Sequence, residues 1–238
     1  MKNILYSRHF GVPKIIRKLV LAHLKDRPTE YTRANRVLSG FERRLRYSVT
    51  QAARQILDCG KAAATPCFVD CGFNEGDVLA KFAAALPGYS LAGYEIQRDL
   101  YEMVSARYPA SQLKNAAVSD RAGTTELFQP RNFTYSVRGG TTIMADKLNE
   151  RDVERTAIVD CVDFRAELQE IRKNHDFVVV KMDIEGAEYH VLERVFEGGE
   201  LLIDFLIIEF HPKSVERARH EALLNRISEL KLPVVTWY

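Results

Sequence analysis

The segment "VVVKMDIEGAEYHVLERV" (178–195) joins an apolar run to a cluster of charged residues around one glycine. Phe177 and the three valines after it are typical of a strand that is buried on both faces. Charged side chains are costly to remove from water, so those that follow are expected at the mouth of a cleft. Open α/β sheets bind ligands at the carboxyl ends of their strands, which is where this cluster falls.

Short apolar segments alternate with amphipathic ones on both sides of this segment. Strands are predicted at residues 67–72, 89–96, 113–120, 123–130, 157–164, 176–184, 201–212 and 232–238. Helices are predicted at residues 75–88, 97–109, 165–174, 186–199 and 214–230. This alternation implies right-handed crossovers and an α/β fold, with a mostly parallel, doubly wound, Rossmann-like sheet between two layers of helices.

Residues 1–60 differ from the remainder in pattern and in charge. Apolar residues at helical spacing predict helices at 12–26 and 32–60. Residues 1–60 hold 13 Lys+Arg and 4 Asp+Glu, a balance of +9, whereas residues 61–238 hold 21 and 28, a balance of −7. We therefore divide the chain into a helical N-terminal extension or lid (1–60) and a main domain (61–238). The extension either contacts an anionic partner, such as nucleic acid, phospholipid or a phosphorylated substrate, or docks on the acidic remainder.

Composition bounds the class and the location of the protein. No apolar run reaches the roughly 18 residues of a membrane span, and the first residues lack the continuous apolar core of a signal peptide. Cys59, Cys67, Cys71 and Cys161 lack zinc-type spacing and are expected to be reduced thiols. A cytoplasmic protein without a transmembrane segment is the resulting expectation.

The motif "VDCGFNEG" places Asp70, Gly72, Asn74 and Gly76 at a predicted strand-to-helix turn. Gly72 lets the backbone turn tightly, and Gly76 lets the start of the helix lie close to a ligand. Asp70 stands where a dinucleotide-binding turn has its first glycine, and a carboxylate there repels a pyrophosphate but pairs with a cationic head group. The turn therefore suits S-adenosylmethionine, which carries an ammonium and a sulfonium and no phosphate. A tight turn without a ligand is the alternative.

Glu95 ends the next predicted strand, 25 residues after Asp70. An acidic residue at this position accepts hydrogen bonds from both ribose hydroxyls of a nucleoside. Ile96, which follows it, is assigned to the same cofactor site. Ala117 is expected beside the adenine ring, although plain strand packing explains its segment equally well.

The candidate catalytic residues are Asp183, Glu185 and His211. Lys181, Asp183 and Glu185 share one side if the strand continues to Glu185. Asp183 is placed to reach a substrate hydroxyl or a sulfonium. His211 is a candidate general base near neutral pH, or else a histidine held by hydrogen bonds at a strand end.

Two further acids are placed near these residues. Glu188 falls in the first turn of a helix, where its charge favours the helix dipole, and it is assigned a structural role. Glu209 alternates with His211 at the tip of the next strand. Asp183 and Glu209 could hold a divalent metal, but the ligand set is too weak to assign one.

Five segments in this order, "FVDCGFNEG", "YEIQRD", "NAAVSD", "VVVKMDIEGAEYHVLERV" and "LIIEFH", resemble the FkbM-type methyltransferases. The resemblance covers about residues 60–212, and "KMDIEGAE" is its most specific element. It implies a class I methyltransferase fold, S-adenosylmethionine as the cofactor and O-methylation of sugars or secondary alcohols. The residues it places around the cofactor are Asp70, Gly72, Asn74 and Gly76 at the methionine moiety, Glu95 at the ribose and Ala117 near the adenine.

The segment "GGTTIM" (139–144) is similar to a small-polar segment of the family, with Thr141 and Thr142 in place of serines. The chain departs from the family pattern in two places, and the first is that residues 1–60 match no pattern of the family. The last predicted strand, 232–238, leaves the usual closing antiparallel strand missing. That strand is expected either from the middle of the chain or from a partner chain that covers the sheet edge.

The sequence therefore predicts a methyltransferase that O-methylates a hydroxyl on a sugar, a glycolipid or a natural-product small molecule. A nucleic-acid (RNA) methyltransferase that uses the basic extension is an alternative, disfavoured by sparse aromatic residues and by "MDIE" in place of an Asn-Pro-Pro-Tyr-like motif. A non-catalytic cofactor-binding protein of the same fold is a second alternative. A nicotinamide-dependent oxidoreductase is disfavoured by Asp70, and a homo-oligomer is compatible with the sequence.

Overall fold

The computed structural model describes residues 45–130, 141–144, 153–211, 215 and 217–236. A helix spans residues 45–59, which confirms the described part of the helix expected at 32–60. The helix expected at 12–26, and most of the lid, lie outside the described residues. Among the described residues, no helix is both long enough and apolar enough to cross a membrane.

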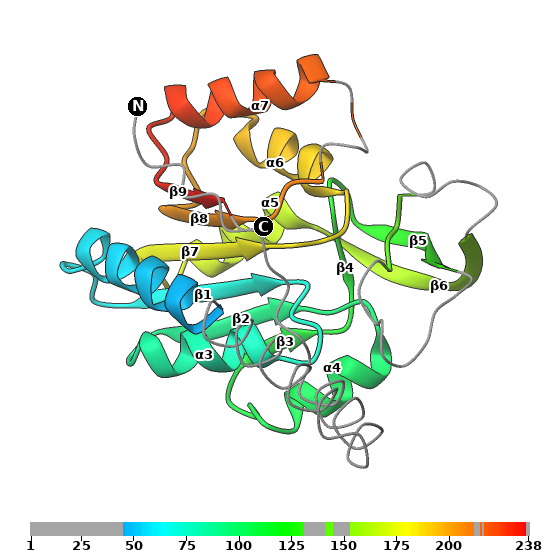
Figure 1. Ribbon diagram of the computed structural model, residues 1–238, viewed down its shortest axis with the longest axis horizontal. Coiled ribbons are helices and arrows are strands. Elements are labelled where there is room, and N and C mark those ends of the chain that lie inside the picture. Colours follow the sequence, from blue (N-terminus) through cyan, green and yellow to red (C-terminus); the bar gives the residue numbers. More distant parts are fainter. Residues whose placement is uncertain (1–44, 131–140, 145–152, 212–214, 216, 237–238) are drawn as a thin grey trace, which may run out of the picture.

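A six-stranded parallel sheet forms the centre of the molecule (Figure 1), in the order β3-β2-β1-β7-β8-β9. Its strands are β1 (Pro66–Cys71), β2 (Ser90–Tyr94), β3 (Gln112–Lys114), β7 (Phe177–Met182), β8 (Phe205–Ile208) and β9 (Val234–Thr236). Every pairing in this sheet is parallel. The strand order reverses between β1 and β7, which confirms the expected doubly wound α/β fold and places a binding crevice at that point.

Helices cover both faces of the sheet (Figure 1). They are α3 (Asp77–Ala85), α4 (Arg98–Ser105), α5 (Phe164–Arg172), α6 (Glu188–Phe196) and α7 (Arg217–Glu229). Helices α5, α6 and α7 share one apolar core with Val178 and Val180 of β7. The helix at residues 45–59 shares the other core with α3, α4 and Val179. Successive valines of β7 thus point to opposite faces, and both faces are buried, as its unbroken apolar pattern predicts.

A smaller three-stranded sheet has the order β4-β6-β5. Its strands are β4 (Ala117–Ser119), β5 (Gly123–Pro130) and β6 (Val153–Asp163). The prediction of one strand at 113–120 is therefore wrong, because its two halves belong to different sheets. The side chain of Asn115 donates to the carbonyls of Glu95 (2.7 Å) and Ile96 (3.2 Å), and the chain leaves the large sheet there.

The middle of the chain supplies an antiparallel strand, but not to the large sheet. Strand β5 pairs antiparallel with β6 in the smaller sheet. Within the described residues, β9 pairs with β8 alone, so the edge of the large sheet beyond β9 is not closed by β5. The strand predicted at 201–212 is shorter than expected, since β8 spans only Phe205–Ile208. Leu202 and Ile203 are buried although they precede it.

Candidate functional site

A cleft opens at the carboxyl ends of β1, β2 and β7 and at the start of β4, with about 620 Å³ of empty space that includes open solvent. Of the residues assigned from sequence, seven line it: Gly72, Asn74, Glu95, Ile96, Ala117, Asp183 and Glu185. Asp70, Gly76 and His211 do not line it.

The turn between β1 and α3 contributes Gly72 and Asn74 to the lining of the cleft. Gly72 has a φ of +78°, and a Cβ built there would lie 2.1 Å from the carbonyl oxygen of Asp183. Its amide donates to the carbonyl of Tyr94 (2.9 Å), and its carbonyl accepts from Lys181 Nζ (2.9 Å). No side chain fits at this position, so the backbones of β1 and β7 approach closely just where a ligand enters.

Glu95 lies at the tip of β2 and is only 4% exposed. Its Oε2 accepts from the amide of Asn74 (2.7 Å), and its Oε1 accepts from the amide of Gln97 (2.9 Å). Burial raises the pKa of Glu95 to about 7. A carboxylate has about four lone-pair sites, so each oxygen can still accept a hydrogen bond from a ligand hydroxyl.

Asp70 lies behind the cleft and forms a buried ion pair with Lys181. Nζ of Lys181 is 3.1 Å from Oδ1 of Asp70, and both side chains are almost fully buried. Burial by itself lowers the pKa of Lys181, but the carboxylates of Asp70 and Asp183 outweigh it, so the pKa is raised and the amine is charged. The contact of Asp70 with a cofactor ammonium therefore stays a prediction, since Lys181 stands in that place here.

Gly76 has a packing function. It has a φ of +76°, and a Cβ there would lie 3.0 Å from a methyl group of Val104 on α4. The residue thus faces α4, and its predicted position beside the methionine moiety of a ligand stays a prediction.

Asp183 and Glu185 both line the cleft, but not by strand alternation. Strand β7 ends at Met182, and Glu185 has a φ of +58°, so the predicted continuation of the strand to Glu185 is wrong. Thr142 Oγ1 donates to the Glu185 carbonyl (2.7 Å) and so secures this turn. Burial and the nearby Glu185 raise the pKa of Asp183 to about 6, although Lys181 opposes the shift.

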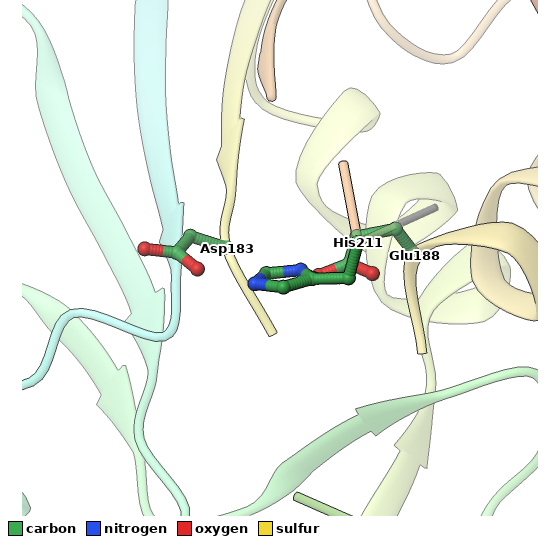
Figure 2. A group of neighbouring side chains, drawn as sticks. All are labelled: Asp183, Glu188 and His211. Carbon is green, nitrogen blue, oxygen red and sulfur yellow. The ribbon is translucent and has the colours of Figure 1, made fainter. Parts of the chain in front are cut away.

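His211 lies between two carboxylates. Its Nδ1 is 2.9 Å from Oε1 of Glu188, and its Nε2 is 3.3 Å from Oε2 of Glu185. Figure 2 shows the imidazole ring lying between Glu188 and Asp183. Both ring nitrogens thus face acids, and the contact of Nε2 helps to hold Glu185 in this conformation. His211 itself does not line the cleft.

Glu188 is fully buried at the start of α6. Its carboxylate accepts from the amides of Ile184 (3.1 Å) and Gly186 (2.9 Å) and also meets His211. One side chain thereby fixes the turn after β7 and the orientation of the imidazole. The helix-start position predicted for Glu188 is confirmed, and these contacts show how it stabilises the site.

The side chains of Asp183, Glu188 and His211 each offer one atom within 4.8 Å of the others, a spacing that could hold a metal ion. Glu209, the other acid considered from sequence, is 8% exposed, and burial with the charge of Asp183 raises its pKa to about 8. Two backbone amides and the imidazole already bind Glu188, so hydrogen bonding explains the arrangement of Glu188 and His211. This explanation does not extend to Asp183, whose Oδ1 has no hydrogen-bond partner among the described residues.

Thr141 and Thr142 also line the cleft, and no role was assigned to either from sequence. They reach it because Thr142 forms a two-way backbone bridge with Phe128 of β5, at 2.9 and 3.0 Å. Two adjacent threonines in a polar segment show neither helix nor strand periodicity, so the pattern of the sequence does not place them at the cleft. The resemblance of "GGTTIM" to a small-residue family segment is the signal that could have pointed to them.

A search of curated proteins finds no match. The chain is similar to solved structures of the plantazolicin methyltransferase BpumL in complex with SAH (13% identity, TM-score 0.32, 77% of this chain and 56% of that chain). It is also similar to that enzyme with a monoazolic desmethylPZN analog and SAH (12% identity, TM-score 0.34, 93% of this chain and 70% of that chain).

In a further complex of BpumL, with a pentazolic analog, this chain spans about half (53%) of the other chain's length. The likeness to these structures is distant. The methyltransferase FkbM domain family matches residues 70–230, which run from the end of β1 through α7 and hold the whole cleft. Because this match spans well over half of its residues, the chain belongs to the FkbM family of S-adenosylmethionine-dependent methyltransferases.

Proposed function

We propose that this methyltransferase transfers a methyl group to a hydroxyl oxygen of a small molecule, such as a sugar, a glycolipid or a natural product. The observation that carries the proposal is the placement of two acids in one cleft. Glu95 follows β2 and Asp183 follows β7, with β1 between the two strands, so they lie about 10 Å apart across two strand spacings.

The β2 side of the cleft fits the nucleoside of S-adenosylmethionine. Glu95 has lone pairs left for two ribose hydroxyls. Ala116 and Ala117 line the same cleft, and their short side chains leave room for the adenine ring. The missing Cβ of Gly72 lets a ligand lie against the turn. The acids Glu95, Asp183 and Glu185 favour a cationic ligand and oppose a pyrophosphate.

The β7 side of the cleft fits an acceptor that must lose a proton. S-adenosylmethionine supplies the activated methyl group, and the residues here have to orient the nucleophile and take its proton. Asp183 is suited to this, because its pKa of about 6 keeps it ionised at neutral pH but more basic than an ordinary aspartate. Alignment of the two reactants supplies a further large part of the rate.

The identity of the acceptor depends on segments around this cleft. Residues 1–60 and 121–160 are expected to build the acceptor pocket, with the N-terminal extension as its lid. Thr141 and Thr142, from the second of these segments, already line the cleft. We therefore expect acceptor selectivity to change when these segments change, while cofactor affinity stays constant.

Two measurements test the proposal. Isothermal titration should show one saturable site for S-adenosylmethionine and for S-adenosylhomocysteine, and no competition by NAD. A panel of sugars, glycolipids and secondary alcohols is then incubated with methyl-labelled donor and read by mass spectrometry. A labelled O-methyl product supports the proposal, whereas label found only on nitrogen, on carbon or on RNA would refute it.

A further inference from the structure

Four buried side-chain oxygen atoms accept or donate no hydrogen bond within the described part of the chain. They are both carboxylate oxygens of Asp70, Oγ1 of Thr141 and Oδ1 of Asp183. Asp70 has its counter-charge in Lys181, 3.1 Å away. Thr141 and Asp183 both line the cleft, and these two atoms are buried beside it.

Thr141 is 8% exposed, and its hydroxyl contrasts with that of the next residue. Thr142 Oγ1 donates to the carbonyl of Glu185 (2.7 Å) and accepts from the amide of Met144 (3.0 Å). The backbone bridge from Thr142 to Phe128 fixes the segment on β5. A buried hydroxyl left unpaired in a segment so well fixed is costly to the fold, which indicates that its partner arrives with a ligand.

We propose that Thr141 and Asp183 hold the acceptor oxygen between them, an inference that rests on the proposed methyl transfer and assigns Thr141 as a substrate-binding residue. The acceptor hydroxyl donates its proton to Oδ1 of Asp183 and accepts a hydrogen bond from Oγ1 of Thr141. Its remaining lone pair forms the new oxygen–carbon bond. The carbon–sulfur bond breaks with its electron pair staying on sulfur, and the proton passes to Asp183.

This pair of groups selects oxygen over nitrogen. A hydroxyl oxygen has two lone pairs, so one can attack while the other accepts from Thr141. A neutral amine has a single lone pair, which the reaction consumes. The proton of Thr141 would then stay unpaired, since no described residue of the chain accepts it. The cleft therefore discriminates against an amine that replaces the reacting hydroxyl.

Replacement of Thr141 by valine removes the hydroxyl at nearly constant volume, and Thr141→Ser restores it. With an accepted alcohol, we expect T141V to lower kcat/KM about 10- to 100-fold, mostly through KM, and T141S to stay within about threefold of wild type. The Kd of S-adenosylhomocysteine should change less than about twofold in both. Thr124→Val, at an exposed position on β5, is the matched control and should behave as wild type.

A crystal structure of the S-adenosylhomocysteine complex gives an answer that needs no acceptor. We expect an ordered water within hydrogen-bond distance of both Thr141 Oγ1 and Asp183 Oδ1, in the place of the acceptor oxygen. A cofactor atom on Thr141, or no water between the two groups, overturns the inference.

The two proposals fail in different ways. Loss of S-adenosylhomocysteine binding by the wild type would refute the proposed function itself. A wild type that methylates an alcohol, together with a T141V variant that is equally active, overturns only the assignment of Thr141. An amine analogue methylated as fast as the matching alcohol also overturns it.

Discussion

The two ends of the cleft differ in how complete they are before a ligand binds. At the β2 end, both oxygens of Glu95 are fixed by the amides of Asn74 and Gln97. At the β7 end, Oδ1 of Asp183 and Oγ1 of Thr141 are buried without hydrogen-bond partners among the described residues. At the first end, hydrogen bonds hold the carboxylate in place before a ligand binds. At the second end, two polar atoms lack hydrogen-bond partners that a ligand can supply.

The difference follows from electrostatics as well as from hydrogen bonding. Near Asp183 lie three further carboxylates, those of Glu185, Glu188 and Glu209, with Lys181 and His211 as the neighbouring cationic or ionisable groups. Repulsion among acids keeps a proton acceptor basic. Backbone amides, in contrast, favour the charged form of Glu95 and oppose the shift that burial causes. This contrast fits the proposed function, in which the β2 end binds the cofactor and the β7 end accepts a proton.

The largest expected effect is on turnover at the β7 end. Asp183→Asn keeps the shape of the side chain but removes the proton acceptor, and a general base typically contributes about 10²- to 10⁴-fold. We expect kcat to fall by about 10³-fold, measured as labelled methyl transfer at saturating cofactor. The Kd of S-adenosylhomocysteine should change less than about tenfold.

Asp160→Asn, on the exposed part of β6, is the control for this variant and should retain full activity. A D183N variant with near-normal kcat would show that the proton leaves by another route. Glu185 would then be the next acid to replace, because it lines the same cleft.

The second effect is on affinity at the β2 end. Glu95→Ala removes the proposed acceptor of two ribose hydroxyls, and hydrogen bonds to a charged group are strong, so we expect the Kd of S-adenosylmethionine to rise about 100-fold (about 2.7 kcal/mol). Titration calorimetry measures this directly. At saturating cofactor, kcat should fall far less than in D183N.

The control is Glu102→Ala on α4, whose side chain is 60% exposed. A thermal melt accompanies both variants, because E95A also leaves the amides of Asn74 and Gln97 without their acceptor. If E95A bound the cofactor as tightly as E102A, the ribose assignment would be wrong and the contrast between the two ends would disappear.

Part of the β2 end could be predicted from sequence because it is local, although Asp70 and Gly76 of the same turn do not line the cleft. Gly72, Asn74 and Glu95 stand at strand tips within 24 residues, and strand-to-helix turns have residue signatures that a short window contains. The parallel sheet followed from the same local alternation. The strand order also places Asp183 at the switch point, since β7 must pair with β1.

The β7 end could not be predicted in full because it is assembled from distant segments. His211 meets Glu188 across 23 residues, and Thr142 meets Glu185 across 43. Nothing in the sequence near His211 shows that two acids occupy its ring nitrogens. The division of 113–120 between two sheets was hidden for the same reason, as it depends on Asn115 binding the carbonyls after β2.

The smallest expected effect is a separation of two pH profiles. Cofactor binding needs ionised Glu95, and its pKa of about 7 means that Kd should rise about tenfold for each pH unit below 7. Turnover of the saturated enzyme needs ionised Asp183, so kcat should fall only below about pH 6. The positive charge of a bound cofactor lowers the pKa of Asp183 below its value in the free enzyme. This widens the gap between the pH at which kcat falls and the pH at which Kd rises. At pH 6, affinity should therefore be reduced by about tenfold while kcat is at least half-maximal.

Calorimetry and single-turnover assays from pH 5 to 8.5 measure the two profiles separately. The Glu95→Gln variant should lose the pH dependence of Kd near 7 but keep that of kcat, because glutamine does not titrate. Coincident profiles would mean that one ionisation controls both steps. In that case the acids of the cleft titrate as a single coupled group, and the two ends are not independent.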